Sequence, residues 1–182
     1  MGHTGLNAGV ARKVGELTLT KKTKLPLEPL KTITLGTFKT VAELKKAIPN
    51  ISGEALCIMA NDSFTMSQDE QEIRLVVCTA AQLGFTNWGY QTDILDAAKA
   101  WGLKICPREG AAYLRIALQE QPEGDRLIVL LDEPVCVATY IWAFSVYREY
   151  ARSGGKLWLG GYSRVNQQPC YAPDSKFAFM LP

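Results

Sequence analysis

The segment from Leu83 to Pro134 limits the folds open to this chain more than any other, because helical and strand patterns alternate in it with clear boundaries. A first helical stretch is expected to begin at a Thr92 cap and to end at Gly102. A second begins at Pro107, a residue suited to the first turn of a helix. The apolar run at 126–131 then predicts a buried strand. The sequence therefore predicts a compact α/β centre.

Local signals also predict elements on the N-terminal side of this segment. Thr40 and Glu43 have the spacing of a capping box, so a helix is expected to begin there. Residues 31–38 and 72–79 are rich in β-branched and apolar residues and predict strands, and residues 52–60 predict a second short helix. Helices thus outweigh strands in this part of the prediction.

The chain changes character after Pro134, where aromatic and β-branched residues dominate. Strands are predicted within 135–150, 156–162 and 176–181, with short connections that favour antiparallel pairing. The expected fold class is α+β. We expect a helix-rich N-terminal and central α/β part followed by an antiparallel C-terminal sheet.

Residues 1–30 are expected to lie outside the folded domain. They are basic, and Pro26 and Pro29 favour an extended linker. The Pro26-x-x-Pro29 spacing could also serve as a ligand for an aromatic groove, but a stiff connector is the simpler interpretation. We therefore expect a flexible basic lead-in with a proline-containing linker over 1–30, and a single α+β domain over 31–182.

The cysteines favour a reducing compartment. There are five of them, widely spaced and without a CxxC pair, which suits buried thiols better than a disulfide framework. No apolar run approaches the length that a bilayer span requires, and the N-terminus lacks an apolar signal region. We therefore expect a soluble, cytoplasmic protein with no membrane partner.

The single histidine, His3, argues against several kinds of site. Catalytic triads, Cys-His pairs and histidine-ligated metal sites all need an ordered imidazole, and His3 lies close to the terminus. The glycine pairs at 154–155 and 160–161 match no phosphate-binding loop, and the acidic residues lack calcium-loop spacing. We therefore expect no metal and no cofactor.

Cys106 is the sharpest candidate for chemistry. If it caps the helix that begins at Pro107, the helix dipole and the neighbouring Arg108 would lower its pKa and favour the thiolate. Glu109 could then act as a base. Against this, no histidine is at hand to activate the thiol, and a Cys-Pro pair is also a sound structural start for a helix.

Asp132 and Glu133 are the next candidates, because they follow a predicted buried strand and strand ends often face clefts. With Glu109 they could in principle serve acid–base catalysis, although a solvated strand end followed by a turn is the simpler interpretation. Arg115 is flanked by apolar residues, and a buried arginine at this place is expected to pair with a carboxylate.

Aromatic residues supply the candidate binding surface. Trp88 and Tyr90 lie in an aromatic loop, and Trp158, Tyr162 and Arg164 follow one predicted strand. Such rings could contact a protein partner, or stack on the bases of single-stranded nucleic acid while the cations meet phosphates. Tryptophan and tyrosine are equally at home in the core of a small sheet.

Three segments carry a resemblance to a family of small bacterial proteins. They read FKTVAELKKAI, AQLGFTNWGYQTDILDAAKAWGLKICPREGAAYLRIALQEQPEGDRL, and KLWLGGY followed by KFAFMLP. The resemblance covers roughly residues 31–182. It implies a single small bacterial domain and implies no activity, because the family has no established one.

These observations favour a non-catalytic binding or regulatory protein with a protein partner. The reason is negative, since no histidine system, metal cluster or nucleotide loop is recognisable. Two alternatives stay open. One is a small enzyme that uses Cys106 or the Asp132 and Glu133 carboxylates. The other is a protein that binds single-stranded nucleic acid through the C-terminal sheet.

Overall fold

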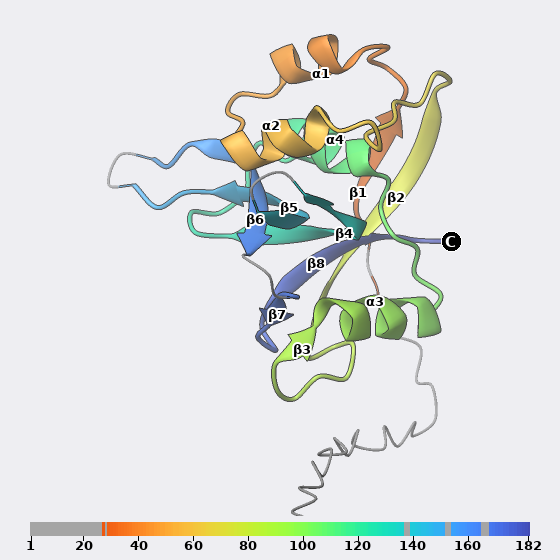
Figure 1. The fold of residues 1–182 in the computed structure, drawn as a ribbon, viewed down its shortest axis with the longest axis vertical. Coiled ribbons are helices and arrows are strands. Elements are labelled where there is room, and N and C mark those ends of the chain that lie inside the picture. The colour runs from red at the N-terminus through yellow and green to blue at the C-terminus, as the bar shows by residue number, and fades with distance from the viewer. Residues whose placement is uncertain (1–26, 28, 137–138, 152–153, 165–167) are drawn as a thin grey trace, which may run out of the picture.

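The computed structural model describes residues 27, 29–136, 139–151, 154–164 and 168–182. Its helices and strands are arranged around one large sheet (Figure 1). His3 and most of the lead-in expected over residues 1–30 lie outside the described residues. Among the helices of the described part, none is long and apolar enough to cross a bilayer.

Strands make up more of the structure than helices, at 37% against 23%. The strands are β1 (Pro29–Leu35), β2 (Gln71–Thr79), β3 (Gly89–Tyr90), β4 (Arg126–Cys136), β5 (Tyr140–Arg148), β6 (Leu157–Arg164), β7 (Cys170–Tyr171) and β8 (Lys176–Met180). The helices are α1 (Val41–Ala47), α2 (Gly53–Met59), α3 (Gln91–Ala100) and α4 (Arg108–Ala117).

Six strands form one mixed sheet in the order β1-β2-β8-β4-β5-β6, and β3 pairs with β7 in a separate ribbon. All neighbouring pairs of the large sheet are antiparallel except β4 and β8, which are parallel. The last strand along the chain therefore lies in the middle of the sheet. Phe177 of β8 is paired with Cys78 on one side and with Ile128 on the other.

This arrangement corrects the expected fold. An α+β class holds at the coarse level, but a helix-rich first part followed by a separate antiparallel C-terminal sheet is wrong. Strands from both halves share one sheet, because β8 pairs with β2 from the N-terminal half. A physical reason is that β8 is buried on both faces, with Phe177 and Phe179 in one core and Ala178 in the other, which suits a strand with neighbours on both sides.

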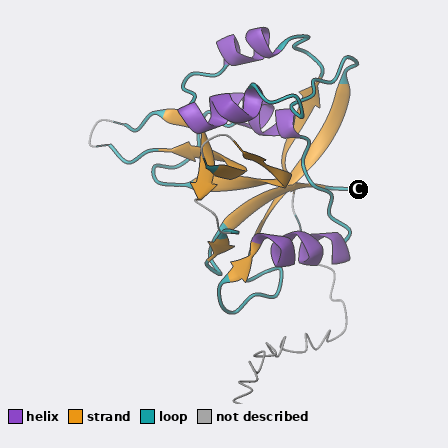
Figure 2. Ribbon diagram, in the orientation of Figure 1, coloured by secondary structure: helices purple, strands orange, loops and turns teal. Residues whose placement is uncertain are grey.

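Helices cover both faces of the sheet (Figure 2). One face packs against α1, α2 and α4, and the other against α3 and the β3–β7 ribbon (Figure 1). Alternate residues of a strand point to opposite faces, so each central strand feeds two apolar cores. In β2, Ile73 and Leu75 enter the first core, while Val76 and Cys78 enter the second. This explains the continuous apolar runs of the sequence.

Two of the helix starts follow from capping residues. The Thr40 side chain accepts from the Glu43 amide at 3.2 Å, and Glu43 accepts from the Thr40 amide at 3.1 Å, which confirms the capping box. Ser52 caps α2 by accepting from the Ala55 amide at 3.3 Å. Side chains therefore satisfy amides at both helix starts that would otherwise lack a partner.

The other two predicted caps are wrong. The cap position of α3 is Tyr90 instead of Thr92, and that of α4 is Pro107 instead of Cys106, and neither helix has a side-chain cap. Tertiary contacts fix these starts instead. For example, the Gln91 side chain at the start of α3 donates to the Leu131 carbonyl at 2.9 Å.

The helix α4 organises the candidate sites. It contacts β1 at one edge of the sheet and also β5 and β6 at the other edge, so it spans the first face. Gly110 in its first turn lies so close to the Cys106 sulfur that an added Cβ would stand 2.5 Å from it. A cavity borders each end of this helix.

Candidate functional site

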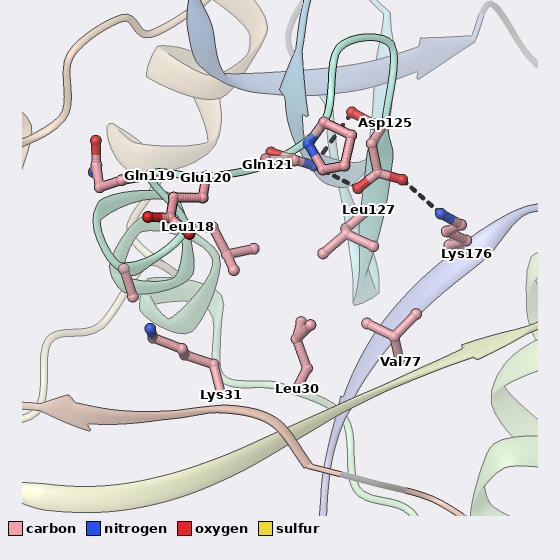
Figure 3. A pocket seen from close by; sticks show the side chains of 12 residues that line it. Leu30, Lys31, Val77, Leu118, Gln119, Glu120, Gln121, Asp125, Leu127 and Lys176 are labelled. Atoms are coloured by element: carbon pink, nitrogen blue, oxygen red, sulfur yellow. Dashed lines mark hydrogen bonds and ion pairs between the residues drawn. The ribbon is translucent and has the colours of Figure 1, made fainter.

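A large cavity lies at the C-terminal end of α4, between the helix and the sheet (Figure 3). Its volume is about 620 Å³, and its walls come from segments that are far apart in the sequence. They are the start of β1, the end of β2, the last turn of α4 with the α4–β4 connection, and the starts of β4 and β8. Cavities of about 300–1,000 Å³ are typical of small-molecule sites.

The lining combines hydrocarbon with a charged rim. The apolar residues are Leu30, Val77, Ala117, Leu118, Pro122 and Leu127. The polar residues are Lys31, Gln119, Glu120, Gln121, Asp125 and Lys176. Figure 3 shows the side chains of Leu30, Leu118 and Leu127 converging on the cavity, with Lys31 reaching from β1 toward the end of α4. Such a lining suits a molecule with an apolar body and one polar group.

A chain of hydrogen bonds runs along the wall of this cavity from α4 to β8. Arg115 donates to Gln121 Oε1 at 2.7 Å, and Gln121 Nε2 donates to Asp125 Oδ2 at 3.2 Å. Asp125 Oδ1 in turn accepts from Lys176 Nζ at 2.6 Å (Figure 3). These bonds hold the α4–β4 connection against β8 and fix the shape of the rim.

Arg115 is fully buried, and its remaining partners are backbone carbonyls. It donates to the Leu118 carbonyl and, at 3.3 Å, to the Tyr147 carbonyl, while its Nε has no hydrogen-bond partner. The expected carboxylate partner is wrong, because no ion pair among the described residues includes Arg115. Its positive charge is therefore met by the Gln121 amide oxygen and two backbone carbonyls, and by no carboxylate directly.

Burial lowers the pKa of Arg115 from 12.5 to about 10, because a low-dielectric surrounding disfavours the charged form. At neutral pH the guanidinium still carries its charge. The Coulomb field of a buried charge is poorly screened by solvent ions. Arg115 therefore contributes a positive potential to the cavity next to it.

The opposite end of α4 borders a smaller cavity of about 290 Å³. Here the structure brings together two of the proposed catalytic residues, Cys106 and Asp132, beside Arg108. Arg108 donates to Asp132 Oδ1 at 3.0 Å and to the Glu133 carbonyl at 3.2 Å. Its guanidinium also contacts the Ser63 hydroxyl. The polar side chains of this cavity are thus bonded mainly to one another.

The Asp132 carboxylate is ionised and committed to this ion pair. Partial burial alone would raise its pKa, but the hydrogen bonds from Arg108 and from the Glu133 amide outweigh that effect. The pKa of Asp132 is therefore below its usual value. A carboxylate in this state is a poor general acid at neutral pH.

Cys106 lies on the floor of the smaller cavity and is buried. Burial, together with the nearby negative charge of Glu109, raises the pKa of this thiol from 9.0 to about 12. The expectation of a lowered pKa is therefore wrong. Cys106 precedes the cap position of α4, so it misses the favourable helix end while losing contact with water.

The remaining two carboxylates do not complete an acid–base site. Glu109 is buried and accepts from the Ser67 amide at 3.0 Å and from the Ser67 hydroxyl, and its second oxygen has no partner. The Glu133 side chain is exposed, and only its backbone carbonyl contacts Arg108. The structure thus gathers the four proposed catalytic residues at one end of α4 without a free, ionisable pair among them.

The aromatic loop before α3 is open to solvent. Trp88 is 66% exposed and Tyr90 is 45% exposed. Tyr90 belongs to β3 and is paired with Cys170 of β7. Large exposed rings of this kind contribute to protein interfaces when they lie in a contiguous patch.

The other proposed binding residues lie on β6 and are half-buried. Trp158 Nε1 donates to Glu149 Oε2 at 3.0 Å, and the Tyr162 ring lies 5.6 Å from the Tyr171 ring at the β3–β7 ribbon. Arg164 follows at the end of the same strand. The structure therefore places Tyr162 near the ribbon that carries Tyr90, whereas Trp158 packs toward Glu149.

Sequence reasoning missed the larger cavity. Lys31 was expected only to begin the strand over residues 31–38. The residues that line the cavity share no motif, because distant strands bring them together. The one signal in the sequence was Arg115, because its apolar neighbours in the chain indicated that its charge is buried.

No protein-family profile, no curated protein and no solved structure matches this chain. Within the described residues, no group of three or more histidine, cysteine or acidic side chains is arranged to hold a metal ion.

Proposed function

We propose that this protein is a non-catalytic binding protein that holds a small amphipathic molecule in the cavity at the C-terminal end of α4. The observation that carries the proposal is the cavity itself, with a volume of about 620 Å³, an apolar interior and a charged rim. Burial of an apolar ligand body would supply roughly 25 cal/mol for each Å² removed from water. The rim would orient the polar group of the ligand.

The chemistry of the lining supports binding over catalysis. Its 12 residues include no hydroxyl, thiol or imidazole group that could act as a nucleophile. The Lys176 ammonium and the Asp125 carboxylate are paired with each other at 2.6 Å. A small enzyme built on Cys106 or on Asp132 and Glu133 stays a prediction, which the raised pKa of Cys106 does not favour.

The compartment belongs to the same proposal. All five cysteines are free thiols, and two of them, Cys78 and Cys106, are buried. Structural disulfides are rare where glutathione and thioredoxin keep thiols reduced. We place the protein in the cytoplasm of a bacterium on this ground and on the resemblance of residues 31–182.

The test uses octanol, which is neutral, so that it probes the apolar interior alone. Leu30 lines the cavity and is 37% exposed, while Leu56 on α2 does not line it and is 40% exposed. Leu30→Gln should weaken octanol binding in calorimetry about five- to tenfold, since roughly 1 kcal/mol of apolar contact is lost. Leu56→Gln is the matched control and should leave the affinity unchanged.

Two results would remove the proposal. One is that octanol and related amphipathic molecules fail to bind the folded full-length protein. The other is that Leu30→Gln and Leu56→Gln change the affinity equally, which would place the binding elsewhere.

A protein partner is the second candidate function, and the exposure of Trp88 and Tyr90 is the observation that favours it. A purified partner that binds through this loop should lose most of its affinity for Trp88→Ala, and little for Trp158→Ala. Equal binding to both variants and to the wild type would show that this loop is not the partner-binding surface. Binding of single-stranded nucleic acid also stays a prediction, and it requires an affinity that falls steeply with added salt.

A further inference from the structure

The charges around the large cavity do not cancel. The rim holds two lysines and two carboxylates, and the fully buried Arg115 adds a positive charge directly behind the wall. Arg115 bonds to Leu118 and Gln121, and both of these residues line the cavity. The nearest groups of the site therefore sum to a positive charge. A buried charge without a direct counter-ion is costly, and an anion nearby would lower that cost.

The negative end of the α4 dipole opposes this charge in part. Two carbonyls at this helix end are already occupied by side chains, one from the helix and one from the connection that follows it. The Leu118 carbonyl accepts from Arg115, and the Ile116 carbonyl accepts from Gln119 Nε2 at 2.6 Å. A cationic ligand would therefore find few free acceptors at the helix end, where cations are otherwise favoured.

One cation of the rim is free to meet a ligand. Lys176 is bound to Asp125, whereas Lys31 joins no ion pair among the described residues. Lys31 follows Leu30 on β1, and its side chain reaches toward the end of α4 across the opening (Figure 3). An anionic headgroup at Lys31 would leave the attached chain on Leu30 and Leu118.

We propose that the ligand is a single-chain amphipathic carboxylate, whose carboxylate pairs with Lys31 at the rim while its hydrocarbon chain enters the cavity. This assignment rests on the proposed function, because it names the class of molecule that the same cavity binds. The positive potential from Arg115 favours the carboxylate over a neutral or cationic headgroup. Glu120 on the rim opposes it weakly, since that side chain is exposed.

The experiment compares octanoate, octanol and octylammonium, which share one chain and differ in headgroup charge. Calorimetry on the full-length protein should give the order octanoate, octanol, octylammonium from tight to weak. Lys31→Gln should weaken octanoate about three- to fivefold, the range expected for an exposed ion pair. Glu120→Gln should strengthen octanoate by a similar factor. Neither substitution should change the affinity for octanol.

Lys99→Gln is the control, because Lys99 on α3 forms only an exposed pair with Asp96 at 3.8 Å and lies away from the cavity. If octanol binds as tightly as octanoate and Lys31→Gln changes neither, the carboxylate assignment is wrong while the cavity remains a binding site. If none of the three molecules binds, both the assignment and the proposed function are wrong. A loss of octanoate affinity in Lys99→Gln equal to that in Lys31→Gln would also overturn the assignment.

Discussion

The two ends of α4 treat their polar groups in opposite ways. At the N-terminal end, Arg108 lies near the surface and pairs with Asp132 at 3.0 Å, above a buried Cys106. At the C-terminal end, Arg115 is fully buried and has no carboxylate partner within the part of the chain that the structure describes, and a cavity more than twice as large adjoins it. One helix therefore carries a guanidinium at each end, and only one of them has an ion-pair partner.

This difference teaches that reactive residue types do not by themselves mark a site. Cysteine, carboxylates and hydroxyls gather at the N-terminal end, but Asp132 is paired with Arg108, and Glu109 accepts from Ser67. The C-terminal end has less reactive side chains, yet it combines accessible space with a buried charge that has no ion-pair partner among the described residues. A cavity beside a buried charge without an ion-pair partner can be stabilised by a bound ligand, whereas groups that are already paired gain little from one.

The largest expected effect concerns Cys106, at the N-terminal end of α4. Cys106 should react with iodoacetamide at neutral pH about a thousandfold more slowly in the native protein than in urea, because its pKa is raised from 9.0 to about 12. Mass spectrometry of peptides after timed labelling gives both rates. Cys136 is exposed and should be labelled in the native protein, which shows that the reagent is active. Equal native rates for the two thiols would mean that this end of α4 is open.

The next largest effect is on stability, to which the two arginines of α4 should contribute unequally. Arg115→Met should lower the free energy of unfolding by about 3 kcal/mol, because it leaves Gln121 and two backbone carbonyls unpaired in the interior. Arg108→Met is the matched control and should cost about 1 kcal/mol, since the Arg108 side chain is 13% exposed but its partner Asp132 is 64% exposed. Urea denaturation measures both. Similar losses for the two variants would contradict the contrast between the ends.

The smallest effect is a dependence of stability on pH. Buried thiols with a raised pKa ionise only in the unfolded chain, so the stability present below pH 9 is lost progressively as the pH rises toward 12. Each of Cys78 and Cys106 should contribute a loss of about 1 kcal/mol between pH 9 and pH 10. Cys106→Ala should remove about half of this dependence in urea denaturation.

Val129→Ala serves as the control for the pH experiment. Val129 is buried and carries no ionisable group, so its truncation should lower stability without changing the dependence on pH. If Cys106→Ala keeps the full wild-type dependence, the thiol titrates alike in the folded and unfolded states. The N-terminal end of α4 would then be accessible to water.

Much of the local structure could be predicted from the sequence. The capping box at Thr40 and Glu43 depends on neighbouring residues alone, and the structure confirms it. The strand around 126–131 was also predicted, because five consecutive apolar residues leave few other conformations. These features need no information about distant parts of the chain.

The order of the strands and the large cavity could not be predicted in this way. β8 pairs with β2, which lies about a hundred residues earlier in the chain, and with β4, which lies about fifty residues earlier. Pairing over such separations depends on burial of both faces and leaves no local signal. The cavity depends on this same pairing, because Val77, Leu127 and Lys176 meet only when β8 lies between β2 and β4.

The most direct test of the account is a map of amide chemical shifts as octanoate is added to the full-length protein. We predict that the shifts gather at Lys31, Leu118 and Leu127, around the C-terminal end of α4. The amides of Cys106 and Asp132, at the other end of the helix, should stay in place. Shifts that gather at Cys106 and Asp132 instead, or no saturable shifts at all, would contradict the claim that the cavity at the C-terminal end of α4 is the binding site.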